Sequence, residues 1–251
     1  MTSLGELAGP ITPEWAWEGS DGTGVVVAVV DSGVDGTHPM VGALDRAVAV
    51  QVTDEKAQTS EVVDDEVGDV AGHGTACAAM VRSVAPGATL WSVRVLGDGL
   101  TGKGWAVADG LEWTLDAGAK VVNLSLSTPN ELLDRRFRRL CDRAARDGVL
   151  VVAALSNERR ATIPAEFTSV LSVAAVADAA PGTVVYQGAQ AEWGAPGVDV
   201  EVAWSGGSTI RATGNSFAAP VVAGLVARVV AKHPELRPFE VRTVLRALAG
   251  G

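Results

Sequence analysis

Five short, uninterrupted apolar runs recur along the chain, and they limit its fold more than any other feature of the sequence. Runs of this length that are rich in valine and lack polar alternation are typical of strands buried on both faces of a parallel sheet. They lie at residues 24–30, 90–96, 120–126, 149–155 and 170–177. Helical patterns at residues 104–117 and 130–147 lie between them. The alternation predicts an α/β fold with a mainly parallel central sheet in a three-layer α/β/α arrangement.

Length and composition fit one globular domain. The chain has 251 residues, 47% of them hydrophobic, and no linker divides it. We therefore expect a single domain over residues 1–251, with an N-terminal arm over residues 1–20. A net charge of −10 argues against nucleic acid and anionic membranes as partners and leaves cationic peptides open. Cys77 and Cys141 are too few for a disulfide framework.

The sequence also allows an expectation about the cellular compartment of the protein. We find no secretory signal and no apolar run long enough to cross a bilayer. The expectation is a cytoplasmic protein, and the oligomeric state stays open.

Three polar residues stand at places where α/β folds build their sites. Asp31 ends the first apolar run, and ligands of such folds bind outside the carboxyl ends of the strands. His73 is flanked by two glycines, which allow another chain to approach closely. The other histidines, His38 and His233, each precede a proline, and we expect structural or solvated roles for them.

Ser216 lies within residues 214–220, at the start of an apolar helical pattern. Unpaired N–H groups at a helix start favour a negative oxygen beside its hydroxyl. Taken alone, Ser216 is better explained as a helix N-cap. We expect Pro220 to lie in the first turn of the helix, where a residue without an N–H is tolerated.

Together these segments resemble the subtilisin-like serine peptidases (subtilases, peptidase family S8). The matching segments are residues 29–35, 72–75, 122–126 and 214–220, with an acid, a histidine and a serine in the chain order of that family. The resemblance covers nearly the whole chain. It implies a subtilisin-like fold and a serine endopeptidase that acts on peptides or proteins.

The resemblance also implies a role for each matching residue. Ser216 would be the nucleophile, His73 the general base and then acid, and Asp31 the carboxylate that orients the imidazole. Asn157, which follows the fourth apolar run, would donate its side-chain amide to the oxyanion beside the N–H of Ser216. A plain turn asparagine is the alternative at this position.

In the resemblance, two segments bind an extended substrate by β-augmentation. One is formed by Gly99, Leu100, Thr101 and Gly102, and the other by Ser125, Leu126 and Ser127. The walls of the primary specificity pocket would be residues 126–128 together with Ala154, Leu155 and Ser156. Family members usually carry smaller residues there, so we expect a narrow pocket and poor cleavage after large aromatic residues.

No metal and no cofactor are expected. Residues 81–83 run directly into residues 84–86, without the insertion that holds calcium in many secreted relatives. The acidic segment that contains Asp64, Asp65, Glu66 and Asp69 lacks regular ligand spacing. It is open to three interpretations: a solvated loop, a loop that favours basic substrates, or a metal site. Cys77, one turn after His73, is expected to be packed and inert.

Several rival functions deserve comparison with a peptidase. Residues 97–104 contain the G-x-x-x-x-G-K core of a phosphate-binding loop, but a glycine replaces the hydroxyl residue that coordinates magnesium. A binding module of subtilase shape, or a peptide acyltransferase or cyclase, remains an alternative. We also expect a dedicated processing role, because the chain lacks segments found in many secreted relatives.

Overall fold

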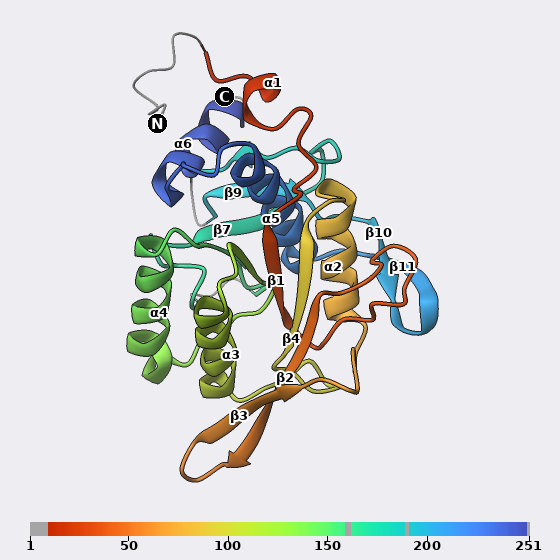
Figure 1. Cartoon of the computed structure of the whole chain (residues 1–251), viewed down its shortest axis with the longest axis vertical. Helices are drawn as coiled ribbons and strands as arrows, with labels where there is room; N and C mark the ends of the chain where they lie inside the picture. The colour runs from red at the N-terminus through yellow and green to blue at the C-terminus, as the bar shows by residue number, and fades with distance from the viewer. Residues whose placement is uncertain (1–9, 159–161, 189–190, 250–251) are drawn as a thin grey trace.

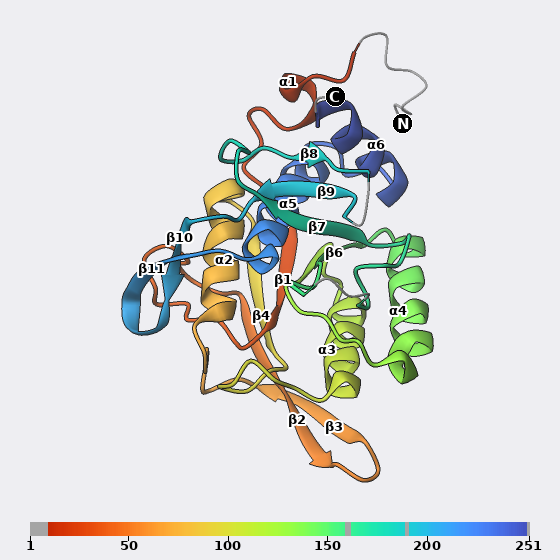
Figure 2. The same cartoon turned by 180° about the vertical axis from the view of Figure 1, so that it is seen from behind.

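The computed structural model describes residues 10–158, 162–188 and 191–249, so part of the expected N-terminal arm lies outside the described residues. Within them, nine strands form one sheet in the order β3-β2-β4-β1-β5-β6-β7-β9-β8, and β10 and β11 form a separate hairpin. The seven inner strands of this sheet, β1 among them, pair in parallel with one another. The two edge strands, β3 and β8, pair antiparallel with their neighbours β2 and β9. Helices cover both faces (Figures 1 and 2), which confirms the predicted three-layer fold.

The strands are β1 (Val26–Asp31), β2 (Arg46–Asp54), β3 (Thr59–Asp64), β4 (Thr89–Arg94), β5 (Val121–Leu124), β6 (Leu150–Ala154), β7 (Leu171–Val176), β8 (Val185–Tyr186), β9 (Trp193–Pro196), β10 (Val200–Trp204) and β11 (Ser208–Ala212). The α-helices are α1 (Pro13–Ala16), α2 (His73–Val84), α3 (Gly104–Ala117), α4 (Asp134–Arg146), α5 (Asn215–Lys232) and α6 (Pro238–Leu248). The described residues also form two short 3₁₀ turns, η2 (Glu131–Leu133) and η3 (Ser205–Gly207).

The two faces of the sheet pack against different helices, and the alternation along β1 shows which side chain points where. Val27 and Val29 belong to the buried cluster formed with α2, α5 and α6. Ala28 and Val30 belong to the cluster formed with α3 and α4. Since successive side chains on a strand point to opposite faces, the next residue, Asp31, points toward α2 and α5.

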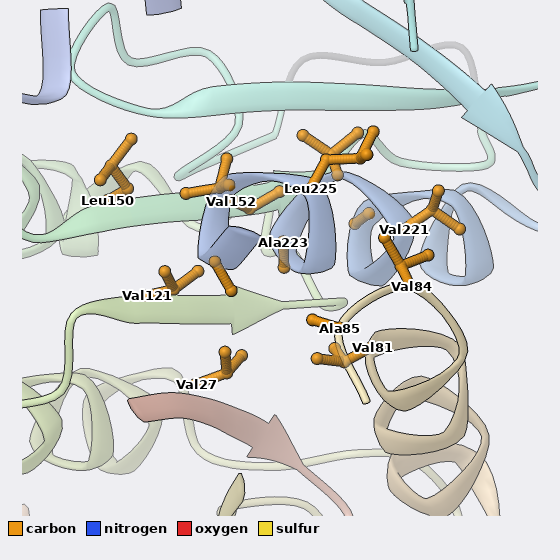
Figure 3. Close-up of a cluster of buried hydrophobic side chains, with 14 of the residues drawn as sticks. Val27, Val81, Val84, Ala85, Val121, Leu150, Val152, Val221, Ala223 and Leu225 are labelled. Atoms are coloured by element: carbon orange, nitrogen blue, oxygen red, sulfur yellow. The ribbon is translucent and has the colours of Figure 1, made fainter. Parts of the chain in front are cut away.

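Helix α5 is the centre of the larger core. Figure 3 shows Val221 of α5 beside Val84 of α2, and Leu225 near Val152 of β6. By length and composition α5 is the one helix among the described residues that is apolar enough to cross a membrane, which corrects the expectation that no such run exists. It is 78% buried inside the protein. An apolar helix of this kind fills a core, because it has to bury nearly its whole circumference.

The structure also adds elements that the apolar runs did not indicate. The segment from Asp54 to Asp69, expected to be a polar loop, contains strand β3, which closes an antiparallel hairpin with β2. The hairpin projects from one end of the molecule (Figure 1). Helix α2 continues without interruption to Val84, as expected from the absence of an insertion there.

Candidate active site

Three elements converge at the carboxyl end of the central strand. Asp31 is the last residue of β1, His73 is the first residue of α2, and Ser216 is the second residue of α5. The chain leaves β1 for β2 on one side of the sheet and later reaches β5 on the other side. Such a reversal of strand order opens a crevice at the carboxyl ends of the strands.

A short hydrogen bond joins the acid to the histidine. His73 Nδ1 lies 2.8 Å from Asp31 Oδ1, and the same oxygen accepts the backbone N–H of Ser32 at 2.7 Å. The Asp31 side chain is fully buried. Because the carboxylate can only accept, Nδ1 carries the proton, and Nε2 is left as the acceptor that faces the crevice.

Cys77 packs beneath this pair, and its sulfur lies 3.8 Å from Asp31 Oδ2 and 3.9 Å from His73 Nδ1. Burial alone lowers the pKa of His73, but the negative charge and the hydrogen bond of the Asp31 carboxylate raise it above its ordinary value. Burial raises the pKa of the Cys77 thiol. The thiol therefore stays protonated at neutral pH, as expected of a packed and inert cysteine.

The carbonyl of Ser216 has an unusual set of donors. In a regular helix it would accept the N–H of residue 220, but Pro220 has none. The Ser125 hydroxyl donates to this carbonyl at 2.8 Å, and Cys77 Sγ approaches it at 3.5 Å. Asn123 donates in turn to Ser125 Oγ at 3.0 Å. Pro220 is the sixth residue of α5 and not part of its first turn, so the expectation for its position was wrong; Ser125 supplies the missing donor.

The side chain of Asn157 contacts the backbone of Asn215, the residue before Ser216. Its Oδ1 accepts the N–H of Asn215 at 3.1 Å, which leaves the Nδ2 hydrogens free to point elsewhere. Asn215 holds the surrounding chain in place, because its side chain accepts from Ala175 N and donates to the carbonyl oxygens of Leu155 and Ser156. The sequence did not reveal this role of Asn215, although Asn215 lies within the segment 214–220 that drew attention to Ser216.

Asp69 is the second residue that the sequence did not reveal. Its Oδ1 accepts from Ser32 Oγ at 2.8 Å and from the N–H groups of Ala71 and Gly72. Its Oδ2 accepts both the N–H and the hydroxyl of Thr75. One carboxylate therefore joins the turn after Asp31 to the first turn of the His73 helix.

The remaining acids of this segment do not share one role. The Asp65 side chain is fully buried and forms two hydrogen bonds of 2.9 Å with the Arg94 guanidinium. Asp64 and Glu66 are exposed. The solvated-loop interpretation therefore fits Asp64 and Glu66, whereas the buried carboxylate of Asp65 and the half-buried Asp69 accept hydrogen bonds within the protein.

Close backbone contact explains one glycine beside His73. A Cβ on Gly74 would lie 1.9 Å from the carbonyl oxygen of Gly33. The helix can approach the turn after Asp31 only because this residue has no side chain.

The first predicted substrate segment forms a turn. Gly97 N donates to Thr101 O at 3.0 Å, and Leu100 lies at φ +54° with 43% of its surface exposed. Gly99 and Gly102 are also exposed. Lys103, the lysine of the phosphate-loop pattern, forms an ion pair with Glu55.

The residues of the predicted pocket walls are half-buried or buried. Leu126 and Leu155 pack against the buried cluster around α3 and α4. Ala154 is buried, and Ser127 and Ser156 are half-buried. Of the six predicted wall residues, only Thr128 lines a cavity found in the described residues, one of about 450 Å³.

The other two histidines are structural, as expected. His38 is 2% exposed, and its Nε2 lies 2.9 Å from the carbonyl oxygen of Ser208. His233 stacks on Trp15 with 4.1 Å between ring centroids. Within the described residues one group of three possible metal ligands occurs, formed by Asp31, His73 and Cys77. The first two are already joined by a hydrogen bond, so an ion would compete with that bond.

Comparisons with known proteins agree with this geometry. A model of the subtilase family matches residues 22–250. Subtilisin Savinase of Lederbergia lenta is 33% identical, over 92% of this chain and 85% of its own length. Subtilisin E of Bacillus subtilis is 30% identical over 92% of this chain, and the chain spans 62% of its length. The crystal structure of a cold adapted subtilisin-like serine proteinase is similar, with a TM-score of 0.70 and 25% identity over 89% of this chain and 81% of that one.

The match of the family model extends over nearly all of the chain, and the relatives match in both sequence and fold. The chain therefore belongs to the subtilase family.

Proposed function

We propose that the protein is a serine endopeptidase that hydrolyses peptide bonds through an acyl-enzyme. The observation that carries the proposal is the 2.8 Å hydrogen bond between buried Asp31 and His73, at the carboxyl end of β1 and beside the helix start that bears Ser216. A serine hydroxyl is a weak nucleophile unless a positioned base removes its proton. Family membership supports the same chemistry.

The proton moves through His73 in both halves of the reaction. Nε2 accepts the proton of the Ser216 hydroxyl as Oγ attacks the carbonyl carbon, and then returns it to the leaving amine as the C–N bond breaks. In the second half a water molecule transfers a proton to Nε2 as its oxygen attacks the ester carbonyl carbon, and Nε2 then returns the proton to Ser216 Oγ as the bond between Oγ and the acyl carbon breaks. Asp31 holds the ring and stabilises the imidazolium that forms in each half.

Two donors suit the developing oxyanion. As the second residue of α5, Ser216 has no helical partner for its N–H. Asn157 has its Oδ1 engaged by Asn215, so its amide hydrogens remain available. In subtilisin, loss of the corresponding asparagine lowers kcat by about 10²–10³, and we expect a loss of this order for Asn157→Ala.

A fluorophosphonate probe tests the activated serine. Intact mass should show a single adduct on the wild type and on Ser83→Ala, whose hydroxyl bonds the carbonyl oxygen of Met80 at the end of α2. Ser216→Ala should show none. No adduct on a folded wild type would overturn the proposal and favour a binding module.

We further propose that the protein processes a particular peptide or protein instead of degrading broadly. The support is Leu126 and Leu155 at the predicted pocket walls, whose half-buried side chains restrict what fits beside Ser216. Incubation with an unfolded protein such as reduced casein should yield a few defined fragments. Digestion to many short peptides would contradict this role.

A further inference from the structure

The side-chain amide of Asn215 lies where the hydrogen bonds between β6 and β7 stop. These strands pair in parallel up to Ala154 and Val173, and the ladder continues with a bond of 2.9 Å from Leu155 N to Val173 O. In a regular parallel ladder the next bond joins Ala175 N to Leu155 O, because each residue bonds two residues of the neighbouring strand that are two positions apart. In this structure Ala175 N donates to Asn215 instead.

Asn215 supplies both halves of the bond that the ladder lacks. Its Oδ1 accepts the N–H of Ala175 at 2.8 Å, and its Nδ2 lies 3.2 Å from Leu155 O and 3.2 Å from Ser156 O. Among side chains, only a primary amide offers an acceptor and two donors at once. Asn215 therefore links the start of α5 to β7 and to the chain that leaves β6.

The segment that Asn215 holds leads directly to Asn157. Leu155 and Ser156 are the two residues before it, so the Asn215 amide fixes the backbone from which the Asn157 side chain projects. The backbone N–H of Asn215 fixes the Asn157 side chain itself, because it donates to Oδ1 at 3.1 Å. Since a donor has to face the oxygen of an amide, this contact turns Nδ2 of Asn157 away from Asn215.

The two donors assigned to the oxyanion thus share one support. Asn215 is covalently joined to Ser216, which bears the first donor, and is hydrogen-bonded to Asn157, which bears the second. An oxyanion site is effective because its donors are positioned in advance where charge develops in the transition state. A change in the spacing of the donors weakens binding of the transition state more than binding of the substrate.

We propose that Asn215 is a positioning residue for peptide hydrolysis, which sets the spacing between the N–H of Ser216 and the amide of Asn157. The inference rests on the proposed peptidase function and names a further residue on which the reaction depends. In this role Asn215 acts through its neighbours and does not touch the reacting atoms.

The test compares kcat and KM for one peptide amide substrate in the wild type, Asn215→Ala, Asn157→Ala and the double variant. For Asn215→Ala we expect kcat to fall at least about tenfold and KM to stay within about threefold, since the loss is felt in the transition state. In the Asn157→Ala background the same change should lower kcat by less than about threefold, because the amide that it positions is absent. Losses that multiply fully in the double variant would overturn the proposal.

The pH profile separates this role from damage to the pair of Asp31 and His73. The midpoint of the kcat/KM profile reports the base, so it should be the same in Asn215→Ala as in the wild type. A shifted midpoint would contradict the proposal.

Ser20→Ala is the matched control. Ser20 Oγ donates to the carbonyl of Arg228 at 2.8 Å, near the end of α5 that lies away from Ser216. This change also removes a side-chain hydrogen bond that holds α5, so the melting temperature should fall while kcat stays within about twofold. An equal loss of kcat in Ser20→Ala and Asn215→Ala would mean that both act through stability, and it would overturn the proposal.

Two further measurements keep the outcome decisive. If Asn215→Ala does not fold, Asn215→Thr replaces it, because a hydroxyl donates and accepts and retains part of the bridge; we then expect a loss in kcat of about threefold that disappears in the Asn157→Ala background. A wild type that labels with the fluorophosphonate probe and cleaves the peptide, with kcat unchanged in the Asn215 variant, fails only the positioning proposal. A wild type that neither labels nor cleaves fails the peptidase proposal.

Discussion

Asp69 Oδ1 accepts a hydrogen bond from Ser32 Oγ at 2.8 Å, and this contact joins the loop before His73 to the turn after Asp31. The same carboxylate receives four further donors, from Ala71, Gly72 and Thr75. Ser32 Oγ also accepts the N–H of Gly74 at 3.0 Å. The relative position of acid and histidine therefore depends on a residue that touches neither of them.

We predict that Asp69→Asn lowers both stability and turnover. Each oxygen of Asp69 faces hydrogen-bond donors, so the amide NH₂ of asparagine opposes donors in either orientation. Hydrogen bonds to charged groups contribute about 1.5–3 kcal/mol each, so the free energy of unfolding should fall by about 3 kcal/mol or more. We expect kcat to fall at least about tenfold while KM changes little. Thermal unfolding and steady-state kinetics provide the two measurements.

The matched control for this prediction is Asp21→Asn. Asp21 Oδ1 accepts the N–H of Thr23 at 2.9 Å in an exposed turn before β1. This change should leave kcat within twofold. If Asp69→Asn behaved like the control, the positioning role would be wrong.

A second prediction concerns the Ser216 carbonyl. Ser125→Ala removes its hydroxyl donor, and Pro220 cannot replace that donor. Leaving a buried acceptor unpaired costs about 1–3 kcal/mol. In a Pro220→Ala background the helical N–H is restored, so the penalty of Ser125→Ala should shrink. Denaturant unfolding of the four proteins of this double-mutant cycle gives the coupling, and a coupling of zero would contradict the explanation.

Much of the fold was predictable because its strands carry a strong local signal. The valine runs placed β1, β4, β5, β6 and β7 correctly, and glycines beside an acid, a histidine and a serine indicated the family. The hairpin of β2 and β3 has no such run, because β3 is an edge strand in which no residue is fully buried. An edge strand need not alternate clearly, since only part of it faces a core.

A residue of the site was predictable only where its neighbours in the sequence form a recognisable motif. Asp69 and Ser125 act through partners that are distant in the chain, and nothing beside them in the sequence names those partners. Glu131 and Glu166 line one cavity although they are distant in the sequence, because tertiary packing brings them to one place. The pocket walls stay a prediction: Leu126 and Leu155 are half-buried and pack against the cluster around α3 and α4.

A third prediction uses the group of Asp31, His73 and Cys77, whose possible ligand atoms lie within 4.8 Å of one another. A soft metal ion such as Hg²⁺ prefers the sulfur and the imidazole, and binding there removes the base from Ser216. We expect micromolar Hg²⁺ to inhibit the wild type and to affect Cys77→Ala much less. Cys141→Ala, which removes the other buried cysteine, should remain sensitive. Equal sensitivity of all three proteins would place the inhibitory site elsewhere.

Cys77→Ala should keep most of its activity in the absence of metal, because the protonated thiol has no part in the proton transfers. We expect kcat/KM within about fivefold of the wild type. A loss of three orders of magnitude would mean that the sulfur takes part in catalysis.

The raised pKa of His73 predicts opposite effects of pH on activity and stability. Below this pKa the imidazolium cannot accept the proton of Ser216, so kcat/KM should rise with pH, with a midpoint above the ordinary value of 6.5. A folded-state pKa above the unfolded value stabilises the folded state fully below pH 6.5, and this contribution is lost as pH rises through the folded-state pKa. Melting temperatures should therefore fall over the window in which activity rises. The comparison is made in a Ser216→Ala background, which prevents self-digestion, with and without Asp31→Asn. The fall should be smaller without the carboxylate, and a kinetic midpoint at or below pH 6.5 would contradict the role assigned to Asp31.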